Sequence, residues 1–208
     1  MLDRVSVYCG SSDGVDPSYL QAAQLTGRTL AQRSVAIVFG GGGTGMMGAL
    51  ADGALAAGGQ VLGIIPRRFN NPELAHPGLT ELRVVETMHE RKAAMAELAQ
   101  AFIALPGGYG TLEELFEILT WSQIGLHTKP VGLLNVKGYY DPLLTFIQHM
   151  LTEGFIYDEH RALLACEAEP EALLQRLEDF RPPEALDRWM HRSAGRSGKP
   201  ASASSHGR

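Results

Sequence analysis

Short apolar segments alternate with longer amphipathic segments along most of the chain. The apolar segments carry Val, Ile, Leu and Ala at consecutive positions, which is typical of strands buried on both faces. They cover Arg4–Cys9, Val35–Phe39, Gln60–Ile65, Leu82–Val85, Ala101–Leu105 and Val131–Asn135. The segments between and after them have helical spacing and cover Ser18–Arg33, Gly45–Ala57, Met88–Gln100, Leu112–Ile124, Pro142–Glu153 and Glu171–Leu177.

This alternation predicts the fold class. Strands that are apolar on both faces need helices on both sides of the sheet, and β-α-β order favours parallel strands. We therefore expect an α/β fold with a doubly wound, mostly parallel, Rossmann-like sheet. One domain is expected to cover residues 1–192. The last stretch, 193–208, reads SAGRSGKPASASSHGR, a composition that cannot bury a core and predicts a flexible tail.

The charge balance argues against nucleic acid as a partner. The chain has 18 Lys and Arg residues against 23 Asp and Glu residues, a net charge of −5, and no basic stripe. Binding to a phosphate backbone requires such a basic surface. A local pair of cations is still compatible with a single bound phosphate.

The sequence also indicates a compartment. Cys9 and Cys166 are too few and too far apart for a disulfide framework or a zinc site. No run approaches the ~18 apolar residues of a membrane span, and the apolar part of the N-terminus, MLDRVSVYCGSS, is too short for a signal peptide. We expect a cytoplasmic protein with no membrane partner and no bound metal.

A first glycine loop, Gly43–Gly48, matches G-x-G-x-x-G between a predicted strand and a predicted helix. The pattern is typical of dinucleotide sites. It follows the second strand rather than the first, however, and the next strand ends in Pro66-Arg67-Arg68 without an acidic residue for a ribose hydroxyl. Three alternatives stay open: an NADP site, tight packing of strand against helix, or close approach of a phosphorylated nucleotide.

A second glycine loop lies between the strand Ala101–Leu105 and the next helix, and it contains Gly107, Gly108 and Gly110. Free N–H groups at the helix start, unobstructed by side chains, are suited to a phosphate. Thr111-x-x-Glu114 also matches a capping box, in which Glu114 folds back on the helix start. A capping box does not require three glycines before it. We therefore interpret the loop as a ligand site, together with Gly10-Ser11-Ser12 after the first strand.

A third segment, Met88–Lys92, begins with another possible capping box, Thr87-x-x-Glu90. Its helix should start at a strand end and face the same crevice. Arg91 and Lys92 then lie in the first turns of the helix, where they are either anion ligands or solvated surface cations. The sequence has no H-E-x-x-H and no C-x-x-C, so metallopeptidase and zinc chemistry have no support.

Four motifs, CGSS, GGGGTGMMG, MHERK and PGGYGTLEE, together resemble those of the LOG ("Lonely Guy") family of cytokinin riboside 5′-monophosphate phosphoribohydrolases. The resemblance runs from about Val5 to Leu177. Older labels call such proteins lysine decarboxylases, but a pyridoxal-phosphate enzyme needs a Schiff-base lysine. The chain offers only four lysines, of which Lys92 alone falls near the crevice: Lys92, Lys129, Lys137 and Lys199.

The resemblance implies hydrolysis of the N-glycosidic bond of these nucleotides, and of AMP, without a metal or organic cofactor, by a homodimer. Arg91 and Glu114 correspond to the family's catalytic residues. The positions that match its substrate contacts are Glu73, Lys92, Gly107, Gly108, Tyr109, Gly110, Thr111, Leu112, Glu113 and Thr120. The chain departs from the family pattern at Gly43-Thr44, where Ser-Val is more common.

The chemistry of the bond suggests a role for each catalytic residue. Cleavage develops positive charge on the ribose, which a carboxylate at Glu114 stabilises while it orients or deprotonates water. Arg91 binds the phosphate or polarises the leaving base, and the residues alone do not decide between these. A non-catalytic nucleotide carrier of the same fold is the alternative function, and an NADP oxidoreductase is a third. A carrier has no use for a carboxylate beside a phosphate.

Overall fold

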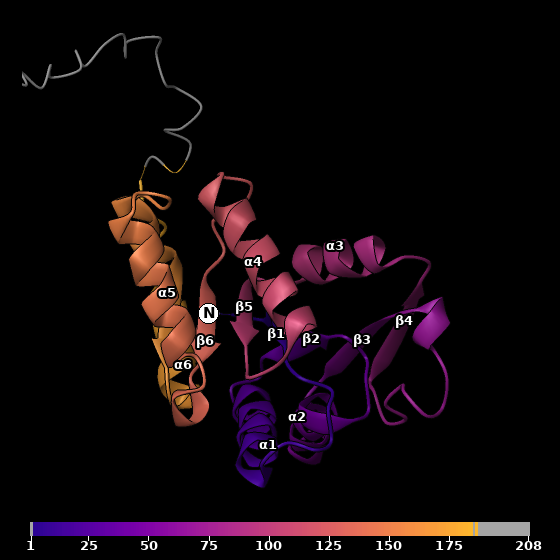
Figure 1. The fold of residues 1–208 in the computed structure, drawn as a ribbon. Coiled ribbons are helices and arrows are strands. Elements are labelled where there is room, and N and C mark those ends of the chain that lie inside the picture. Colours follow the sequence, from indigo (N-terminus) through magenta and orange to yellow (C-terminus); the bar gives the residue numbers. More distant parts are fainter. Residues whose placement is uncertain (1, 185, 187–208) are drawn as a thin grey trace, which may run out of the picture.

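A computed structural model describes residues 2–184 and 186 of the chain. Within these residues, seven parallel strands form one sheet in the order β4-β3-β2-β1-β5-β6-β7 (Figure 1). The strands are β1 (Arg4–Tyr8), β2 (Ala36–Phe39), β3 (Val61–Pro66), β4 (Glu81–Val85), β5 (Ala101–Ala104), β6 (Val131–Leu134) and β7 (Leu164–Glu167). The predicted α/β class with a parallel sheet is confirmed.

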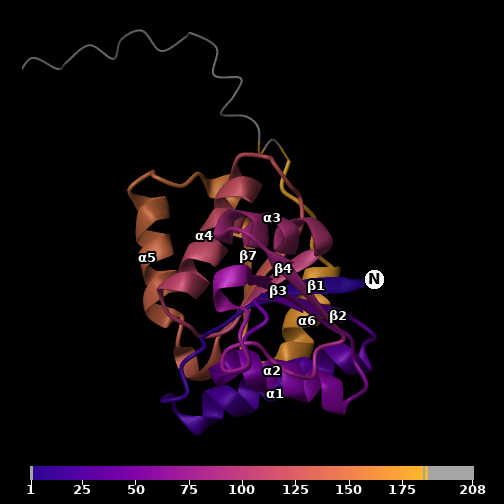
Figure 2. The same cartoon turned by 90° about the vertical axis from the view of Figure 1, so that its right-hand side faces the viewer.

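Helices cover both faces of the sheet, as its apolar strands require (Figures 1 and 2). One face carries α1 (Pro17–Gln32), α2 (Gly45–Ala56) and α6 (Pro170–Glu178). The other carries α3 (Met88–Leu98), α4 (Tyr109–Gln123) and α5 (Asp141–Thr152). Three short 3₁₀ helices, η1 (Arg67–Phe69), η2 (Val136–Gly138) and η3 (Asp158–Leu163), lie in the connections. A separate apolar core fills the space between the sheet and each helical layer.

The order of the strands places a crevice between β1 and β5. These two strands are neighbours, with Val5 paired to Ala101 and Tyr8 to Ala104. The helices that follow them, α1 and α4, leave toward opposite faces of the sheet. In open parallel sheets such a point of divergence, at the carboxyl ends of the strands, is where ligands bind.

Two glycines bring α1 and α2 into close contact. A Cβ atom at Gly27 would lie 2.1 Å from the carbonyl oxygen of Leu50, and one at Gly53 would lie 2.1 Å from that of Gln24. Side chains at these positions would force the helices apart. The glycines therefore fix the relative position of the two helices and of the loops that precede them.

Most predicted boundaries lie within one or two residues of the observed ones, with three differences. Strand β7 was not predicted. Helix α4 begins at Tyr109, three residues earlier than the predicted start at Leu112. The predicted capping box at Thr111 is wrong, because Gly108 occupies the N-cap position and the carboxylate of Glu114 contacts an arginine instead.

The predicted N-cap at Thr87 is confirmed, since Thr87 Oγ1 accepts a hydrogen bond from the Glu90 N–H at 3.1 Å. The Glu90 carboxylate accepts from the Glu86 N–H at 2.9 Å instead of closing the capping box on Thr87. Within the described part of the chain, no helix is long and apolar enough to cross a bilayer. The predicted end of the domain at residue 192 and the predicted tail over 193–208 lie outside the described residues.

Candidate active site

The carboxyl ends of β1 and β5 open into a cavity of about 550 Å³, within the size range of small-ligand sites. Its walls come from the loop after β1, the start of α2, the loop after β5, the start of α4 and the segment after η2. The residues that line it are Cys9, Gly10, Ser11, Ser12, Val15, Tyr19, Met46, Met47, Arg91, Pro106, Gly107, Gly108, Tyr109, Gly110, Thr111, Glu114 and Tyr139. All three loops that the sequence indicated therefore contribute to one cavity.

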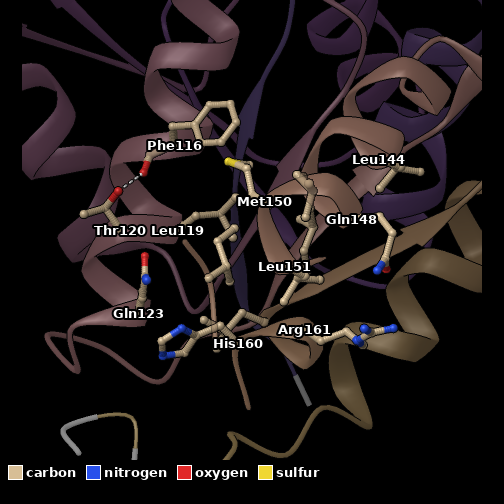
Figure 3. A pocket seen from close by; sticks show the side chains of 14 residues that line it. Phe116, Leu119, Thr120, Gln123, Leu144, Gln148, Met150, Leu151, His160 and Arg161 are labelled. Carbon is tan, nitrogen blue, oxygen red and sulfur yellow. Dashed lines mark hydrogen bonds between the residues drawn. The ribbon is translucent and has the colours of Figure 1, made fainter. Parts of the chain in front are cut away.

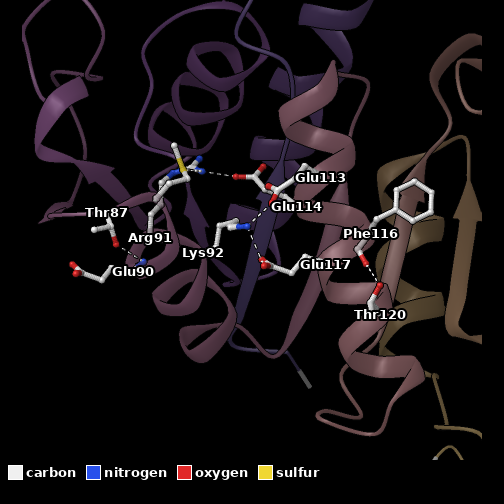
Figure 4. A network of polar contacts seen from close by, with 10 residues as sticks. Thr87, Glu90, Arg91, Lys92, Glu113, Glu114, Phe116, Glu117 and Thr120 are labelled. Atoms are coloured by element: carbon white, nitrogen blue, oxygen red, sulfur yellow. Dashed lines mark hydrogen bonds and ion pairs between the residues drawn. The ribbon is translucent and has the colours of Figure 1, made fainter. Parts of the chain in front are cut away.

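The two predicted catalytic residues form a buried ion pair across this cavity. Arg91 extends from α3 and Glu114 from α4, with Arg91 Nη1 2.5 Å from Glu114 Oε1 (Figure 4). Their side chains are only 13% and 10% exposed. Burial raises the pKa of Glu114, and the Arg91 guanidinium opposes that shift without cancelling it. A carboxyl with a raised pKa holds a proton more readily than a free carboxyl does, which suits a group that exchanges protons during a reaction.

A glycine makes room for the arginine. Arg91 Nε donates to the carbonyl oxygen of Ile64 on β3 at 3.2 Å, which holds the guanidinium against this strand. A Cβ atom at Gly40, directly after β2, would lie 2.1 Å from Arg91 Nη2. The glycine after β2 is therefore required by the position of Arg91.

The start of α4 presents backbone N–H groups to the cavity. The first intrahelical bond runs from the Leu112 N–H to the Gly108 carbonyl at 3.1 Å, so the amides of the three residues before Leu112 precede the helical ladder. A Cβ atom at Gly108 or Gly110 would meet nothing within 4 Å. Aligned amides with open space in front of them provide a site for an anion, which the helix dipole also favours.

Gly107 has a different role from its two neighbours. A Cβ atom there would lie 2.1 Å from Thr111 Oγ1 and 2.9 Å from the Gly10 nitrogen. The loop after β5 is thus packed directly against the loop after β1. Gly107 is needed for the fold, whereas Gly108 and Gly110 keep the mouth of the site open.

The first glycine loop packs against the chain itself. The N–H groups of Met46 and Met47 donate to the Gly10 carbonyl at 3.0 and 3.3 Å, and the Gly45 N–H donates to Asp13 Oδ1 at 2.7 Å. Gly45 has a φ of +57°, and its Cβ atom would lie 2.5 Å from the Ser11 carbonyl carbon. The tight-packing alternative is therefore favoured for this loop over a phosphate or dinucleotide site.

Lys92 lies on α3 beside Arg91 but does not line the cavity. Its ammonium contacts the carboxylates of Glu113 and Glu117, the latter at 3.0 Å (Figure 4). Burial lowers the pKa of Lys92, but the two carboxylates outweigh it and the net shift is upward. Lys92 and Glu113 thus form a second bridge between α3 and α4, and their predicted contacts with substrate stay predictions.

Three further predicted contacts lie away from this cavity. Thr120 donates to the Phe116 carbonyl at 2.6 Å and lines a separate groove between α4 and α5 (Figure 3). Leu112 packs against the core under α4. Glu73 is exposed, and its N–H donates to Asn71 Oδ1 at 3.0 Å. Of the predicted contacts, only the five residues Gly107–Thr111 line the cavity.

The loop that carries Glu73 forms the wall of a second, smaller cavity. It is held against the first glycine loop by the Gly43 N–H, which donates to the Leu74 carbonyl at 2.8 Å. The second cavity, of about 290 Å³, shares Ser11, Met47 and Arg91 with the first. Its apolar wall comprises Ile65, Phe69, Leu74 and Met88. Phe69 and Leu74 were not predicted from the sequence as site residues, although exposed apolar side chains in a polar loop are a usable signal.

The lysines do not provide a Schiff-base site in the described structure. None of the three described lysines lines the cavity. Lys129 Nζ donates to the Ala96 carbonyl at 2.7 Å, and Lys137 Nζ lies 3.1 Å from Asp16 Oδ2. Lys199 lies outside the described residues. Among residues 2–184 and 186, no group of three His, Cys, Asp or Glu side chains is arranged to hold a metal.

Comparison with known proteins gives consistent matches. A family model described as "Possible lysine decarboxylase" matches residues 47–177. The cytokinin riboside 5'-monophosphate phosphoribohydrolase LOG7 of Arabidopsis thaliana is 48% identical over 179 residues, which cover 86% of this chain and 82% of the relative. The cytokinin riboside 5'-monophosphate phosphoribohydrolase of Rhodococcoides fascians is 56% identical over 153 residues, 73% of this chain and 77% of the relative.

Among solved structures, the molybdenum cofactor binding protein of Rippkaea orientalis matches with a TM-score of 0.66 at 21% identity, over 86% of this chain and 96% of that chain. The molybdenum cofactor carrier protein of Chlamydomonas reinhardtii matches with a TM-score of 0.64 at 21% identity, over 86% of this chain and 100% of that chain. At this identity the likeness shows a shared fold alone.

The different surroundings of the glycines predict different effects of alanine. Gly108→Ala and Gly110→Ala should fold normally and weaken binding of inorganic phosphate, because the added methyl group obstructs the open helix start. Gly107→Ala is the matched control and should lower the free energy of unfolding by about 1–3 kcal/mol through overpacking. Calorimetric titration with phosphate and thermal unfolding measure the two effects. Unchanged phosphate affinity in both cavity-facing variants would contradict the assignment.

The burial of Glu114 predicts its titration. The pKa of its side-chain carboxyl should lie above the ordinary value of 4.5, because burial disfavours the charged form. Arg91→Met should raise that pKa further, since it removes the opposing cation. Carbon-13 NMR of the carboxyl, assigned with Glu114→Gln, measures both values. A lower pKa in Arg91→Met than in the parent protein would show that the guanidinium does not stabilise the carboxylate.

Proposed function

Since the chain belongs to the LOG family, we propose that it hydrolyses the N-glycosidic bond of cytokinin riboside 5′-monophosphates and of AMP. The products are a free purine base and ribose 5-phosphate. The observation that carries this proposal is the placement of two different functions on one helix. The amides at the start of α4 suit a phosphate, and Glu114 lies one turn further along, about 6 Å along the helix axis from Gly110.

This spacing supports a specific binding pose. A 5′-phosphate at the start of α4 brings the anomeric carbon of the ribose toward Glu114. The carboxylate then offsets the positive charge that develops on the sugar and takes a proton from the attacking water, which balances the proton that the departing base takes up. The ion pair with Arg91 favours the charged form of Glu114 and so opposes the effect of burial.

The position of Arg91 supports a role at the base. Its side chain borders both cavities, so a nucleotide that extends from one to the other passes the guanidinium. We place the purine in the second cavity, where the apolar side chains of Phe69, Leu74 and Met88 accommodate a ring and its substituent. Arg91 can then donate a hydrogen bond to the departing base while it holds Glu114.

The other functions considered have less support. Relatives with 48–56% identity are named as phosphoribohydrolases, which favours the enzyme over a non-catalytic nucleotide carrier. An NADP oxidoreductase is disfavoured because the amides at the start of α2 are bonded within the chain. We also propose a cytoplasmic location, which the two scattered cysteines support.

We further propose a homodimer formed through the face of α4 and α5. Helix α5 contains no buried residue, although it carries Leu143, Leu144, Phe146, Ile147 and Met150. Phe146 and the nearby Phe155 are 56% and 81% exposed. Together with the groove of about 310 Å³ between the two helices (Figure 3), they form an apolar surface of the kind that copies of a chain cover.

The proposed activity is tested with Glu114→Gln. This variant should keep its fold and nucleotide binding but lose turnover by ~10²–10⁴-fold, because the amide neither accepts a proton nor offsets a ribosyl cation. Glu113→Gln is the matched control, since it removes the neighbouring carboxylate of α4, which pairs with Lys92 of α3 outside the cavity. Free base released from AMP and from isopentenyladenosine monophosphate is measured by chromatography. Near-normal turnover in Glu114→Gln, or a loss explained by unfolding, would refute the mechanism.

The pose also predicts that the 5′-phosphate is required. Adenosine should be cleaved at least ~100-fold more slowly than AMP, because two or three charge-assisted hydrogen bonds of roughly 1.5–3 kcal/mol each are lost. The comparison uses kcat/KM for the two substrates with one enzyme preparation. Similar values would mean that the start of α4 does not anchor the substrate.

The proposed dimer predicts a mass in solution that is twice the mass of one chain. Sedimentation of the parent protein at micromolar concentration should give twice the 22.5 kDa of the chain. Phe146→Glu should shift the protein toward monomer, because it places a charge on the apolar face. Phe69→Glu, on a surface away from α5, is the matched control for added charge and should leave the mass unchanged. A parent protein that sediments as a monomer would rule the dimer out.

A further inference from the structure

The loop that precedes α4 is held by an unusual set of hydrogen bonds. All three successive carbonyls of Leu105–Gly107 are bonded to groups outside the loop, at 2.6, 3.0 and 2.6 Å. In chain order the donors are the Tyr140 hydroxyl, the Gly10 N–H and the Tyr139 hydroxyl. Two of the three donors are therefore adjacent tyrosine side chains, supplied by the segment after η2.

The third bond lies at the most pliable peptide of the loop. The peptide unit between Gly107 and Gly108 has glycine on both sides, so its rotation meets no Cβ atom. In a trans peptide the C=O and the following N–H point in opposite directions. The bond from Tyr139 to the Gly107 carbonyl therefore also fixes the direction of the Gly108 N–H. Gly108 is the N-cap residue of α4 and lines the cavity, so its amide is one more of the amides that precede the helical ladder. Rotation of this peptide would put a carbonyl in place of that amide, and a carbonyl oxygen repels phosphate.

The Tyr139 hydroxyl is itself held in place by packing. The ring lies edge to face against Tyr140, with centroids 5.1 Å apart, and against Tyr19, with centroids 5.9 Å apart. Lys137 of η2 pairs with Asp16 at 3.1 Å and lies 5.7 Å from the Tyr19 ring centroid, which ties η2 to the start of α1. The Tyr139 hydroxyl is thus held between α1 and the loop after β5.

We propose that Tyr139 is a positioning residue for phosphate: its hydroxyl holds the Gly107–Gly108 peptide with the amide, rather than the carbonyl, available to the anion. The proposal rests on the function proposed above, in which the 5′-phosphate binds at the start of α4. Tyr139 does not act on the bond that breaks. Its contribution belongs to the affinity for phosphate and not to the chemical step.

The test is Tyr139→Phe, which removes one hydroxyl and keeps the ring contacts. KM for AMP and the inhibition constants of ribose 5-phosphate and inorganic phosphate should all rise by about 10-fold, the effect of one strong hydrogen bond. The value of kcat should stay within about twofold of the parent value, since Arg91 and Glu114 are unaffected. Binding of adenosine, which lacks the phosphate, is the matched control and should not change.

Three results would overturn the proposal. One is equal phosphate affinity in the variant and the parent protein. Another is weaker binding of both adenosine and phosphate combined with a lower melting temperature, which would show a structural role only. The last is a fall in kcat without a change in KM. Direct titration with phosphate decides the role of Tyr139 even if the parent protein does not hydrolyse AMP, a failure that would count against the proposed function alone.

Discussion

The site depends on the buried guanidinium of Arg91, whose positive charge must be compensated by ion-pair and hydrogen-bond partners. Removing one partner of a buried ion pair typically costs about 3–5 kcal/mol, because the remaining charge has no compensation. Arg91 is compensated by Glu114 from α4 and by the Ile64 carbonyl from β3, in space that Gly40 leaves free. One side chain thereby fixes the relative positions of α3, α4, strand β3 and the loop after β2.

The glycines of the site divide into two groups by what surrounds them. Gly45 and Gly107 are needed because backbone from another loop occupies the place of a side chain. Gly108 and Gly110 face open space, so the fold would accept a side chain at either position. Their lack of one is better explained by a ligand that approaches the backbone. A count of glycines in the sequence cannot separate these groups, since the separation depends on contacts between distant loops.

Much of the fold was predictable because the strands are apolar on both faces and the helices between them are long. Strand β7 was missed because its four residues, Leu164–Glu167, include only one buried side chain and lack the apolar run of the central strands. The start of α4 was predicted too late because Gly108-Tyr109-Gly110 has low helix propensity, whereas here an open helix start is part of the site.

The site itself was predicted in part. The loop–helix motif led to Gly107–Thr111 and Glu114, which do meet Arg91 in one cavity. The position of Lys92 depends on rotation about α3, because its neighbour Arg91 points about 100° away around the helix. Thr120 lies more than two turns beyond the start of α4, on the α5 side. Tyr139 has no local signal, since only the folded chain brings it to Gly107.

The hydrogen bonds at the start of α2 bear on selectivity among nucleotides. Three helices, α1, α2 and α4, begin at the cavity. At the start of α1 the amides of Ser18 and Tyr19 are already bonded to Asp16, and at the start of α2 those of Gly45, Met46 and Met47 are bonded to Asp13 and Gly10. Of the three, α4 is the helix whose first amides are available to a ligand. A nucleoside diphosphate or triphosphate would therefore gain no second helix dipole for its additional charge. A monophosphate matches the number of anion positions that the fold supplies.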